Sequence, residues 1–197
     1  MARILTILLA ICFCAAPGQA REHVPILPVL NMILMRTVSP AQPFSLSSTS
    51  FSDGGYLSSR YALGGSNISP QLSWNNPPGG TRYYRIKVYD LDATDATGQN
   101  WIHWLLEVPA SVTSLAENAG AAGGANLPAG SIRYSNSFFG QGNQAAAGTD
   151  YDGPDPPSGE PHRYRFSVTP LDINKNPLCS PAYLEAKYTK FTPPPAP

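Results

Sequence analysis

The amino-acid sequence predicts a mainly β protein with one ordinary domain. From Phe44 onward, short apolar segments alternate with turn-forming residues, such as those at 53–55 and 64–67, as is typical of strands joined by turns. The 21 prolines and 17 glycines fall between these segments, and no long helical stretch occupies the centre of the chain. A length of 197 residues suits one domain with short appendages.

Four segments have the composition and spacing of strands. Residues 83–89 and residues 162–169 alternate clearly between apolar and polar side chains. Residues 101–108 are apolar on both faces, which indicates a central, buried strand. Residues 72–74 are a shorter candidate that ends at a proline- and glycine-rich turn.

The regions outside these strands carry weaker signals. Residues 111–150 are rich in alanine, glycine, serine and asparagine, which predicts a long, mobile connection with room for one short helix. Residues 181–188 are predicted to form one or two turns of helix. Residues 192–197 are proline-rich and are expected to be unstructured.

The N-terminus has the pattern of a secretory signal peptide, assigned to residues 1–20. Arg3 gives a positive start, residues 4–16 are apolar, and residues 17–20 are small or turn-forming. The apolar segment is too short for a comfortable membrane span, so we expect export to the periplasm or the medium without a transmembrane anchor. Of the three cysteines only Cys179 would remain after cleavage, which leaves no intramolecular disulfide.

Residues 21–42 fit no element well. Their apolar run is short and is interrupted by Pro25 and Pro28. The segment is interpreted as a linker or an extended signal region. A start at Met32 or Met35, which would give a chain without a signal, is the alternative.

The charge composition argues against two classes of partner. The chain has 13 basic and 13 acidic residues, so its formal net charge is zero. It has no run of lysine or arginine, and therefore lacks the basic footprint of proteins that bind nucleic acid or an anionic membrane. We expect no nucleic-acid partner.

Two aspartates follow the strand at 83–89. Side chains two residues apart share a strand face, and the parity of the apolar side chains carries Asp90 and Asp92 to the core side at the end of this strand. The alternative is a pair of turn residues with solvated side chains.

Two histidines and a tyrosine also lie on apolar strand faces. His162 and Tyr164 begin the apolar face of the strand at 162–169, and His103 lies in the strand that is apolar on both faces. Each histidine taken alone fits a buried side chain with a structural hydrogen bond.

Read together, these groups predict one polar cavity. Burying unpaired charges is costly, so inward-facing aspartates and histidines from different strands are expected to pair. Imidazoles held by carboxylates beside a tyrosine hydroxyl could cradle a phosphate or carboxylate group. The loop at 151–161 contains four prolines and would give the cavity a stiff wall, although it could also be a rigid turn without a role in binding.

Five short motifs occur in an order that is more specific than any one of them. They are ISPQLSW at 68–74, DLDA at 90–93, IHW at 102–104, GPDPP at 153–157 and HRY at 162–164. In this order they resemble the phosphatidylethanolamine-binding (Raf kinase inhibitor-like) family, and its bacterial branch in particular. The resemblance covers residues from about 43 to 172.

This resemblance implies a fold and a site. The fold would be mainly β, with a large central antiparallel sheet packed on a smaller sheet and a few peripheral helices. The domain would span residues 43–176, followed by a divergent proline-rich tail at 177–197. The pocket would bind a small anionic group, and by position it would be lined by Asp90, Asp92, His103, Pro156, His162 and Tyr164.

The resemblance also implies a function. Members are reported to bind phosphorylated headgroups and to inhibit kinases or proteases by contact, generally without catalysis. The chain is therefore expected to be an exported binding or regulatory protein, not an enzyme, without a cofactor. Its ligand would carry a phosphate or carboxylate group, as in a phospholipid headgroup or a phosphorylated protein.

The sequence departs from the family pattern at three places. Thr94 stands where the family usually has proline after the Asp-x-Asp-Ala element, which puts the rigidity of that loop in doubt. Asp155 adds an acid beside the mouth of the pocket, which could weaken anion binding. The C-terminal region does not match the family's closing helix and strand.

Two other functions remain open. A metal-dependent hydrolase could use the same histidines and aspartates as ligands of a first-row metal. The sequence has neither a His-Glu-x-x-His motif nor a Gly-x-Ser-x-Gly nucleophile elbow. An exported interaction protein with a vestigial pocket is the third possibility.

Overall fold

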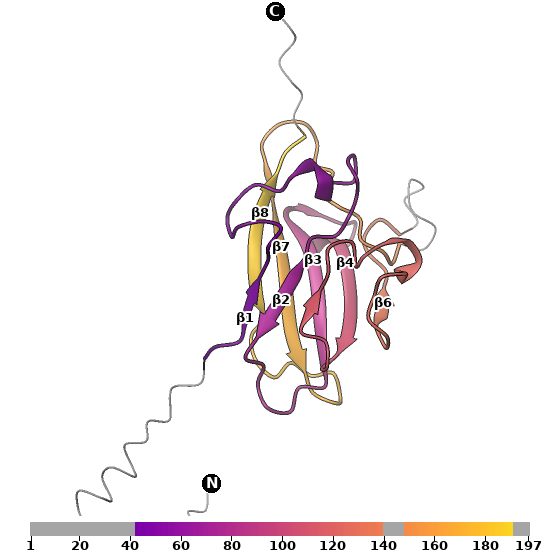
Figure 1. The fold of residues 1–197 in the computed structure, drawn as a ribbon. Coiled ribbons are helices and arrows are strands. Elements are labelled where there is room, and N and C mark those ends of the chain that lie inside the picture. The colour runs from indigo at the N-terminus through magenta and orange to yellow at the C-terminus, as the bar shows by residue number, and fades with distance from the viewer. Residues whose placement is uncertain (1–41, 140–147, 191–197) are drawn as a thin grey trace, which may run out of the picture. The chain divides into compact units, whose positions relative to one another are not determined.

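Eight strands in two antiparallel sheets make up the fold (Figure 1). The computed structural model describes residues 42–139 and 148–190. The predicted signal peptide, residues 1–20, lies outside the described residues, as do the predicted linker up to residue 41 and the proline-rich end from residue 191.

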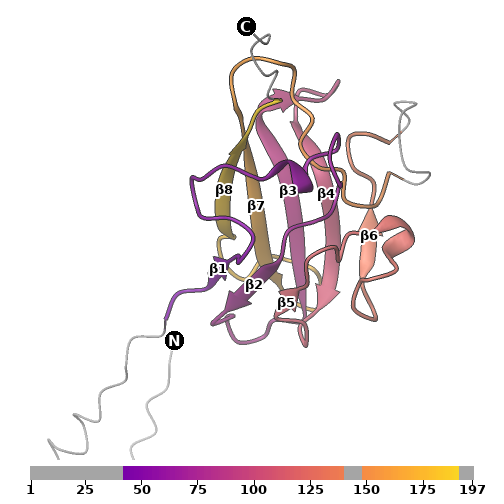
Figure 2. The same cartoon turned by 45° about the horizontal axis from the view of Figure 1, so that its top comes forward.

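The larger sheet has five strands and contains three of the predicted strands. In sheet order they are β6 (Ile132–Tyr134), β4 (Asn100–Pro109), β3 (Tyr83–Thr94), β7 (His162–Leu171) and β8 (Ala182–Tyr188). The smaller sheet contains the fourth and has the order β1 (Ser45–Ser47), β2 (Leu72–Asn75) and β5 (Ser114–Leu115). The smaller sheet lies over one face of the larger one (Figures 1 and 2). The expected mainly β fold, with a large sheet packed on a small one, is confirmed.

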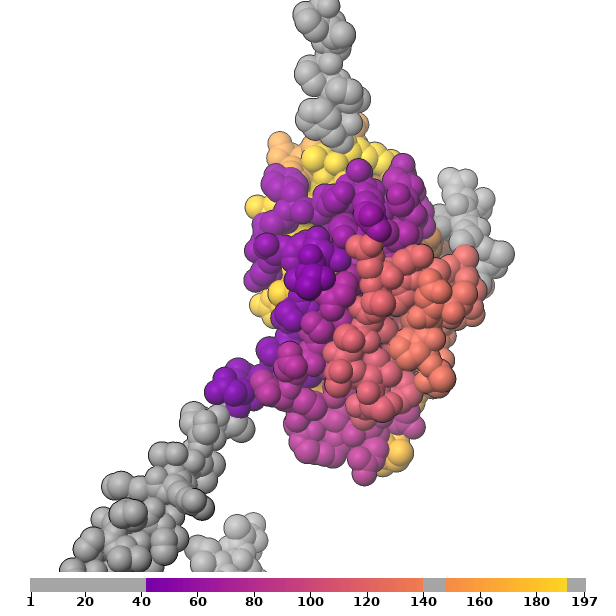
Figure 3. All heavy atoms as spheres, in the orientation of Figure 1, coloured from indigo at the N-terminus to yellow at the C-terminus, as the bar shows by residue number. Residues whose placement is uncertain are grey.

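The core lies between the two sheets and follows the period-2 pattern. Tyr84, Ile86 and Val88 of β3 are at most 1% exposed, as the apolar parity of this strand predicts. Trp74 of β2 packs on Tyr84, with ring centroids 5.2 Å apart. Burial of each such side chain contributes about 1.5–3 kcal/mol. On this side the N-terminal part of the described chain and the connection after β4 cover the large sheet (Figure 3).

Outside the strong strands, one expectation was wrong and the structure refines two others. Residues 181–188, expected as helix, contain the whole of strand β8, because β7 offers a free edge along which they pair. The connection at 111–150, expected to be long and mobile with room for one short helix, holds the short 3-10 helix η2 and also contributes β5 and β6. The peripheral helices reduce, within the described residues, to two 3-10 turns of three residues, η1 (Ser59–Tyr61) and η2 (Ala122–Gly124). None of the described helices is long and apolar enough to cross a lipid bilayer.

A fully buried carboxylate lies on the opposite face of the large sheet. Glu107 of β4 accepts hydrogen bonds from Arg85 of β3, at 3.0 and 2.7 Å, and from the hydroxyl of Tyr134 of β6, at 2.9 Å. Lys175, in the connection between β7 and β8, also donates to it. Burial opposes ionisation of Glu107, but these hydrogen bonds outweigh it and lower the pKa of the carboxyl group. These hydrogen bonds to Glu107 therefore fix the β7–β8 connection to the large sheet.

Candidate functional site

A cavity of about 130 Å³ lies where β3, β4 and β7 meet at one end of the large sheet. Five of the six residues predicted for the site line it: Asp90, His103, Pro156, His162 and Tyr164. Five further residues complete the lining: Ala93, Trp101, Phe138, Asp155 and Pro157. The antiparallel order of the sheet explains the convergence, because the end of β3 lies beside the starts of β4 and β7.

A β-bulge directs His103 into the cavity. The register of β3 and β4 pairs Val88 with Trp104 but Tyr89 with Ile102, so that His103 is an extra residue on β4. A bulge turns two consecutive side chains toward the same face. His103 and Trp104 are accordingly both buried, at 2% and 1% exposure.

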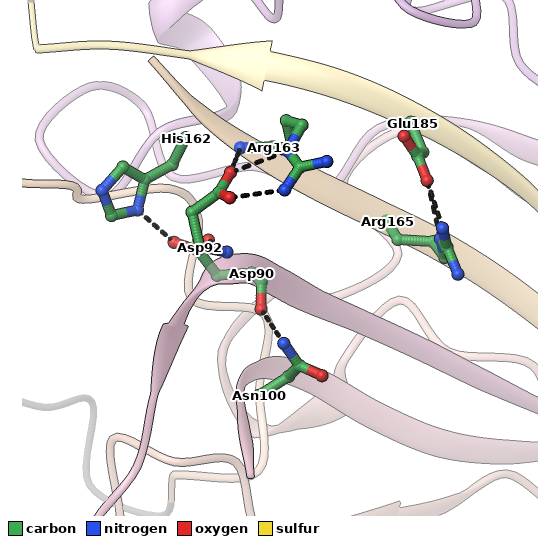
Figure 4. A network of polar contacts seen from close by, with 7 residues as sticks. All are labelled: Asp90, Asp92, Asn100, His162, Arg163, Arg165 and Glu185. Carbon is green, nitrogen blue, oxygen red and sulfur yellow. Dashed lines mark hydrogen bonds and ion pairs between the residues drawn. The ribbon is translucent and has the colours of Figure 1, made fainter. Parts of the chain in front are cut away.

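Asp90 and His162 form the polar wall between β3 and β7. Asp90 lies directly opposite Tyr164 in the register of these strands. Its Oδ2 accepts a hydrogen bond from His162 Nδ1 at 2.8 Å, and its Oδ1 accepts one from the backbone N–H of Asp92 at 2.8 Å (Figure 4). The side chain of His162 remains 20% exposed, whereas that of Asp90 is 4% exposed.

Asp92 does not line the cavity, so its predicted place was wrong. The register of β3 against β4 is irregular between Tyr89 and Thr94. The inward direction of the side chains before Tyr89 therefore does not predict the direction of Asp92. Asp92 instead accepts hydrogen bonds from the guanidinium of Arg163 at 2.6 and 3.1 Å and from its backbone N–H at 2.7 Å (Figure 4). The hydrogen bonds from Arg163 lower the pKa of Asp92. Asp92 thus anchors the start of β7, directly beside His162.

The hydrogen bonds of His103 fix its tautomer. Nδ1 lies 2.7 Å from the carbonyl oxygen of Asp152 and 3.2 Å from that of Gly153. Carbonyl oxygens only accept, so Nδ1 carries the hydrogen and, in the neutral ring, Nε2 is an acceptor. Burial lowers the pKa of His103, although the hydrogen bonds to the carbonyls act in the opposite direction. His103 is therefore neutral at pH 7.

Three polar atoms of residues that line the cavity are buried without a hydrogen-bond partner among the described residues. They are His103 Nε2, the hydroxyl of Tyr164 and Trp101 Nε1, which can only donate. The rings of His103 and Tyr164 pack edge to face, with centroids 5.2 Å apart. Burial and the Asp90 carboxylate raise the pKa of Tyr164, so its hydroxyl keeps its hydrogen and can donate. Buried polar atoms are almost always satisfied by protein, water or ligand, and these three atoms suit an occupant that can both donate and accept.

Asn136 holds the segment that supports His103. Its amide nitrogen donates to Asp152 Oδ2 at 2.7 Å and to the Asp150 carbonyl at 3.2 Å. Its side-chain oxygen accepts from the backbone N–H of Phe138 at 3.0 Å. Phe138 packs against the ring of His103, with centroids 5.2 Å apart. One buried amide thereby positions both the carbonyl that orients His103 and an aromatic wall of the cavity.

The residues that sequence reasoning missed lie outside regular strands or at their ends. Trp101 is the second residue of β4, and Phe138 follows β6 in the glycine- and alanine-rich connection. Period-2 parity does not apply to such positions. The one available signal was the aromatic character of Phe138 within an otherwise small-residue segment.

Two larger surface hollows lack this grouping of titratable side chains. One, of about 530 Å³, is lined by Phe44, Cys179 and the turn at 76–79. The other, of about 320 Å³, lies beside Asp150 and Tyr151. Among residues 42–139 and 148–190, no three His, Cys, Asp or Glu side chains are grouped so that they could hold a metal ion.

The burial of His103 predicts a pH-dependent stability. The unfolded chain binds a proton at this ring near pH 6.5, whereas the folded protein does so only at lower pH. Stability should thus be complete above pH 6.5 and fall on acidification, by at most about 1.4 kcal/mol per pH unit. Urea unfolding at pH 7.5 and 5.5 measures this. His103→Gln should lose the dependence, and an unchanged stability of the parent protein at pH 5.5 would contradict it.

Comparisons with known proteins agree with the fold and with the order of the motifs. The family model described as phosphatidylethanolamine-binding protein matches residues 47–192. The YbcL protein of Escherichia coli is 37% identical over 127 residues, which are 64% of this chain. The match covers 64% of YbcL, so this chain spans less than two thirds of the length of YbcL. The LppC protein of Mycobacterium tuberculosis, which carries a lipoprotein name, is 30% identical over 158 residues, 79% of this chain and 70% of LppC.

Solved structures show the same architecture. The structure of E. coli YbcL, described as a member of the mammalian PEBP family, superposes with a TM-score of 0.65 at 29% identity, and covers 76% of this chain and 100% of YbcL. The PEBP homologue CT736 of Chlamydia trachomatis gives a TM-score of 0.60 at 23% identity, over 75% of this chain and 98% of CT736, and supports the fold alone.

Proposed function

Because the chain belongs to the phosphatidylethanolamine-binding protein family, we propose that it is a binding protein, not an enzyme, whose cavity takes a small oxyanion such as phosphate. Family membership fits a binding protein. The site residues add the chemistry: a hydroxyl that can donate, two imidazoles and a carboxylate that orients one of them. The cavity of about 130 Å³ suits a small group and not a large ligand.

The observation that carries the proposal is the group of three buried, unpartnered polar atoms on residues that line the cavity: His103 Nε2, the Tyr164 hydroxyl and Trp101 Nε1. A monoprotonated or diprotonated phosphate could accept from Tyr164 and donate to His103 Nε2 through its own hydroxyl. A fully ionised group could instead bind with proton uptake at His103, since a bound negative charge favours the imidazolium form. The second route favours binding at lower pH, whereas the first does not, because both protonated forms of phosphate carry the hydroxyl that it needs.

We also propose that the protein is exported. The signal-like pattern at residues 1–20 supports this. The lipoprotein name of the relative LppC is consistent with it. Detection of the mature N-terminus after expression in a bacterial host tests the proposal, and a chain recovered unprocessed in the cytoplasm would contradict it.

Phosphate should stabilise the protein by linkage. Free phosphate at ten times its dissociation constant is expected to raise the melting temperature by about 3–6 °C. Tyr164→Phe should leave the unliganded melting temperature nearly unchanged, because the hydroxyl has no hydrogen bond to lose. It should nevertheless reduce the response to phosphate. Thermal unfolding at constant ionic strength measures both.

The same variant controls for general salt effects. Phosphate stabilises many proteins because it is excluded from their surfaces, and that effect would be equal in the parent protein and in Tyr164→Phe. Equal phosphate responses of the two proteins would therefore contradict binding in the cavity.

A further inference from the structure

Two carboxylates line the cavity, and only one of them is paired with another residue of the lining. Asp90 is buried and held by His162. Asp155 lies on the exposed side, with its side chain 33% exposed. A negative charge at this position would repel an entering anion over the few ångströms that separate the cavity walls.

Lys190 supplies the missing positive charge from the segment that follows β8. Its Nζ lies 2.5 Å from Asp155 Oδ1. Among residues 42–139 and 148–190, no other lysine or arginine forms an ion pair with a residue that lines the cavity. No lysine or arginine is among the described residues that line the cavity.

Other contacts hold this segment against the proline-rich loop. Tyr188 pairs with His162 in the register of β7 and β8, and the Thr189 hydroxyl donates to the carbonyl of Gly159 at 2.9 Å. The end of β8 and the loop that leads into β7 accordingly lie together at the top of Figure 1. These contacts hold the two residues that precede Lys190 beside the end of the loop that contains Asp155.

We infer that Lys190 neutralises Asp155 and thereby sets the preference of the cavity for anions, which makes the segment after β8 part of the binding site. The inference rests on the proposed function. The pair is too exposed to contribute much to folding, since the side chain of Lys190 is 47% exposed. The charge of Lys190 acts instead on an anion that enters the cavity. Removing it should therefore change the affinity for the anion but not the stability of the fold.

Four proteins test the inference by calorimetric titration with inorganic phosphate at constant ionic strength. Lys190→Ala should weaken binding about fivefold, because it leaves Asp155 uncompensated. Asp155→Asn should tighten binding by a similar factor. The double variant should return to within about twofold of the parent protein, since neutralisation no longer matters once the carboxylate is gone. Lys187→Ala, which removes the same charge from β8, should bind like the parent, because Lys187 forms no ion pair within the part of the chain that the structure describes.

The outcomes separate the inference from the proposed function. Absence of phosphate binding by the parent protein would refute the function and the inference together. Binding by the parent with an unchanged Lys190→Ala would refute the inference alone. So would a double variant as weak as Lys190→Ala, because Lys190 would then contact the anion directly instead of neutralising Asp155.

Discussion

Replacing His103 with alanine is expected to lower the free energy of unfolding by about 3 kcal/mol and to abolish the response to phosphate. The ring is almost fully buried, so its removal leaves a cavity. It also leaves the carbonyl oxygens of Asp152 and Gly153 without the donor that they share. Chemical denaturation of His103→Ala measures the first effect, and thermal unfolding with phosphate measures the second.

His162→Ala separates the loss of stability from the loss of the phosphate response. Its own side chain is 20% exposed, but the buried carboxylate of Asp90 would lose the hydrogen bond that His162 donates, so the expected cost is about 1–3 kcal/mol. The phosphate response should still disappear. A His162→Ala protein that folds normally and responds to phosphate like the parent would show that the imidazole of β7 has no role in binding.

Replacing Glu107 with alanine is expected to cost about 2–3 kcal/mol and to leave the phosphate response unchanged. The carboxylate is fully buried and joins β3, β6 and the β7–β8 connection. Stranding a wholly buried charge costs more, but Arg85 and Lys175 are 39% and 34% exposed and can reach water. Urea unfolding of Glu107→Ala gives the free energy.

Glu185 provides a matched control on the same sheet. It pairs with Arg165, but its side chain is 29% exposed (Figure 4), so Glu185→Ala should cost less than about 1 kcal/mol. Equal losses for Glu107→Ala and Glu185→Ala would show that burial of Glu107 does not decide its contribution. A changed phosphate response in Glu107→Ala would show that the two faces of the sheet are coupled.

Regular alternation made most of the sheet predictable from sequence. Residues 83–89 and 162–169 place every second side chain in the core, and β3 and β7 follow this pattern. Residues 181–188 have no clear alternation and are predicted as helix, whereas the open edge of β7 decides their conformation as strand β8. Long-range pairing of that kind leaves little trace in the local sequence.

The site was predictable wherever a side chain lay on a regular strand face. Asp90 and Tyr164, which pair across β3 and β7, follow directly from parity. A bulge directs His103 into the cavity, and an irregular register directs Asp92 away from it. Neither feature is visible in a period-2 pattern. The pairing of Lys190 with Asp155 depends on where the chain runs after β8, which only the fold determines.

The central claim is that imidazoles from two separate strands meet at one cavity that binds a small oxyanion. Imidazole NMR signals of His103 and His162, assigned from the single-residue variants, can be followed while inorganic phosphate is added at constant ionic strength and pH. We expect both rings to shift together along one saturable curve, with the same dissociation constant, and the shifts to shrink in Tyr164→Phe. Signals that stay fixed, or two rings that titrate with unrelated constants, would contradict a shared binding site.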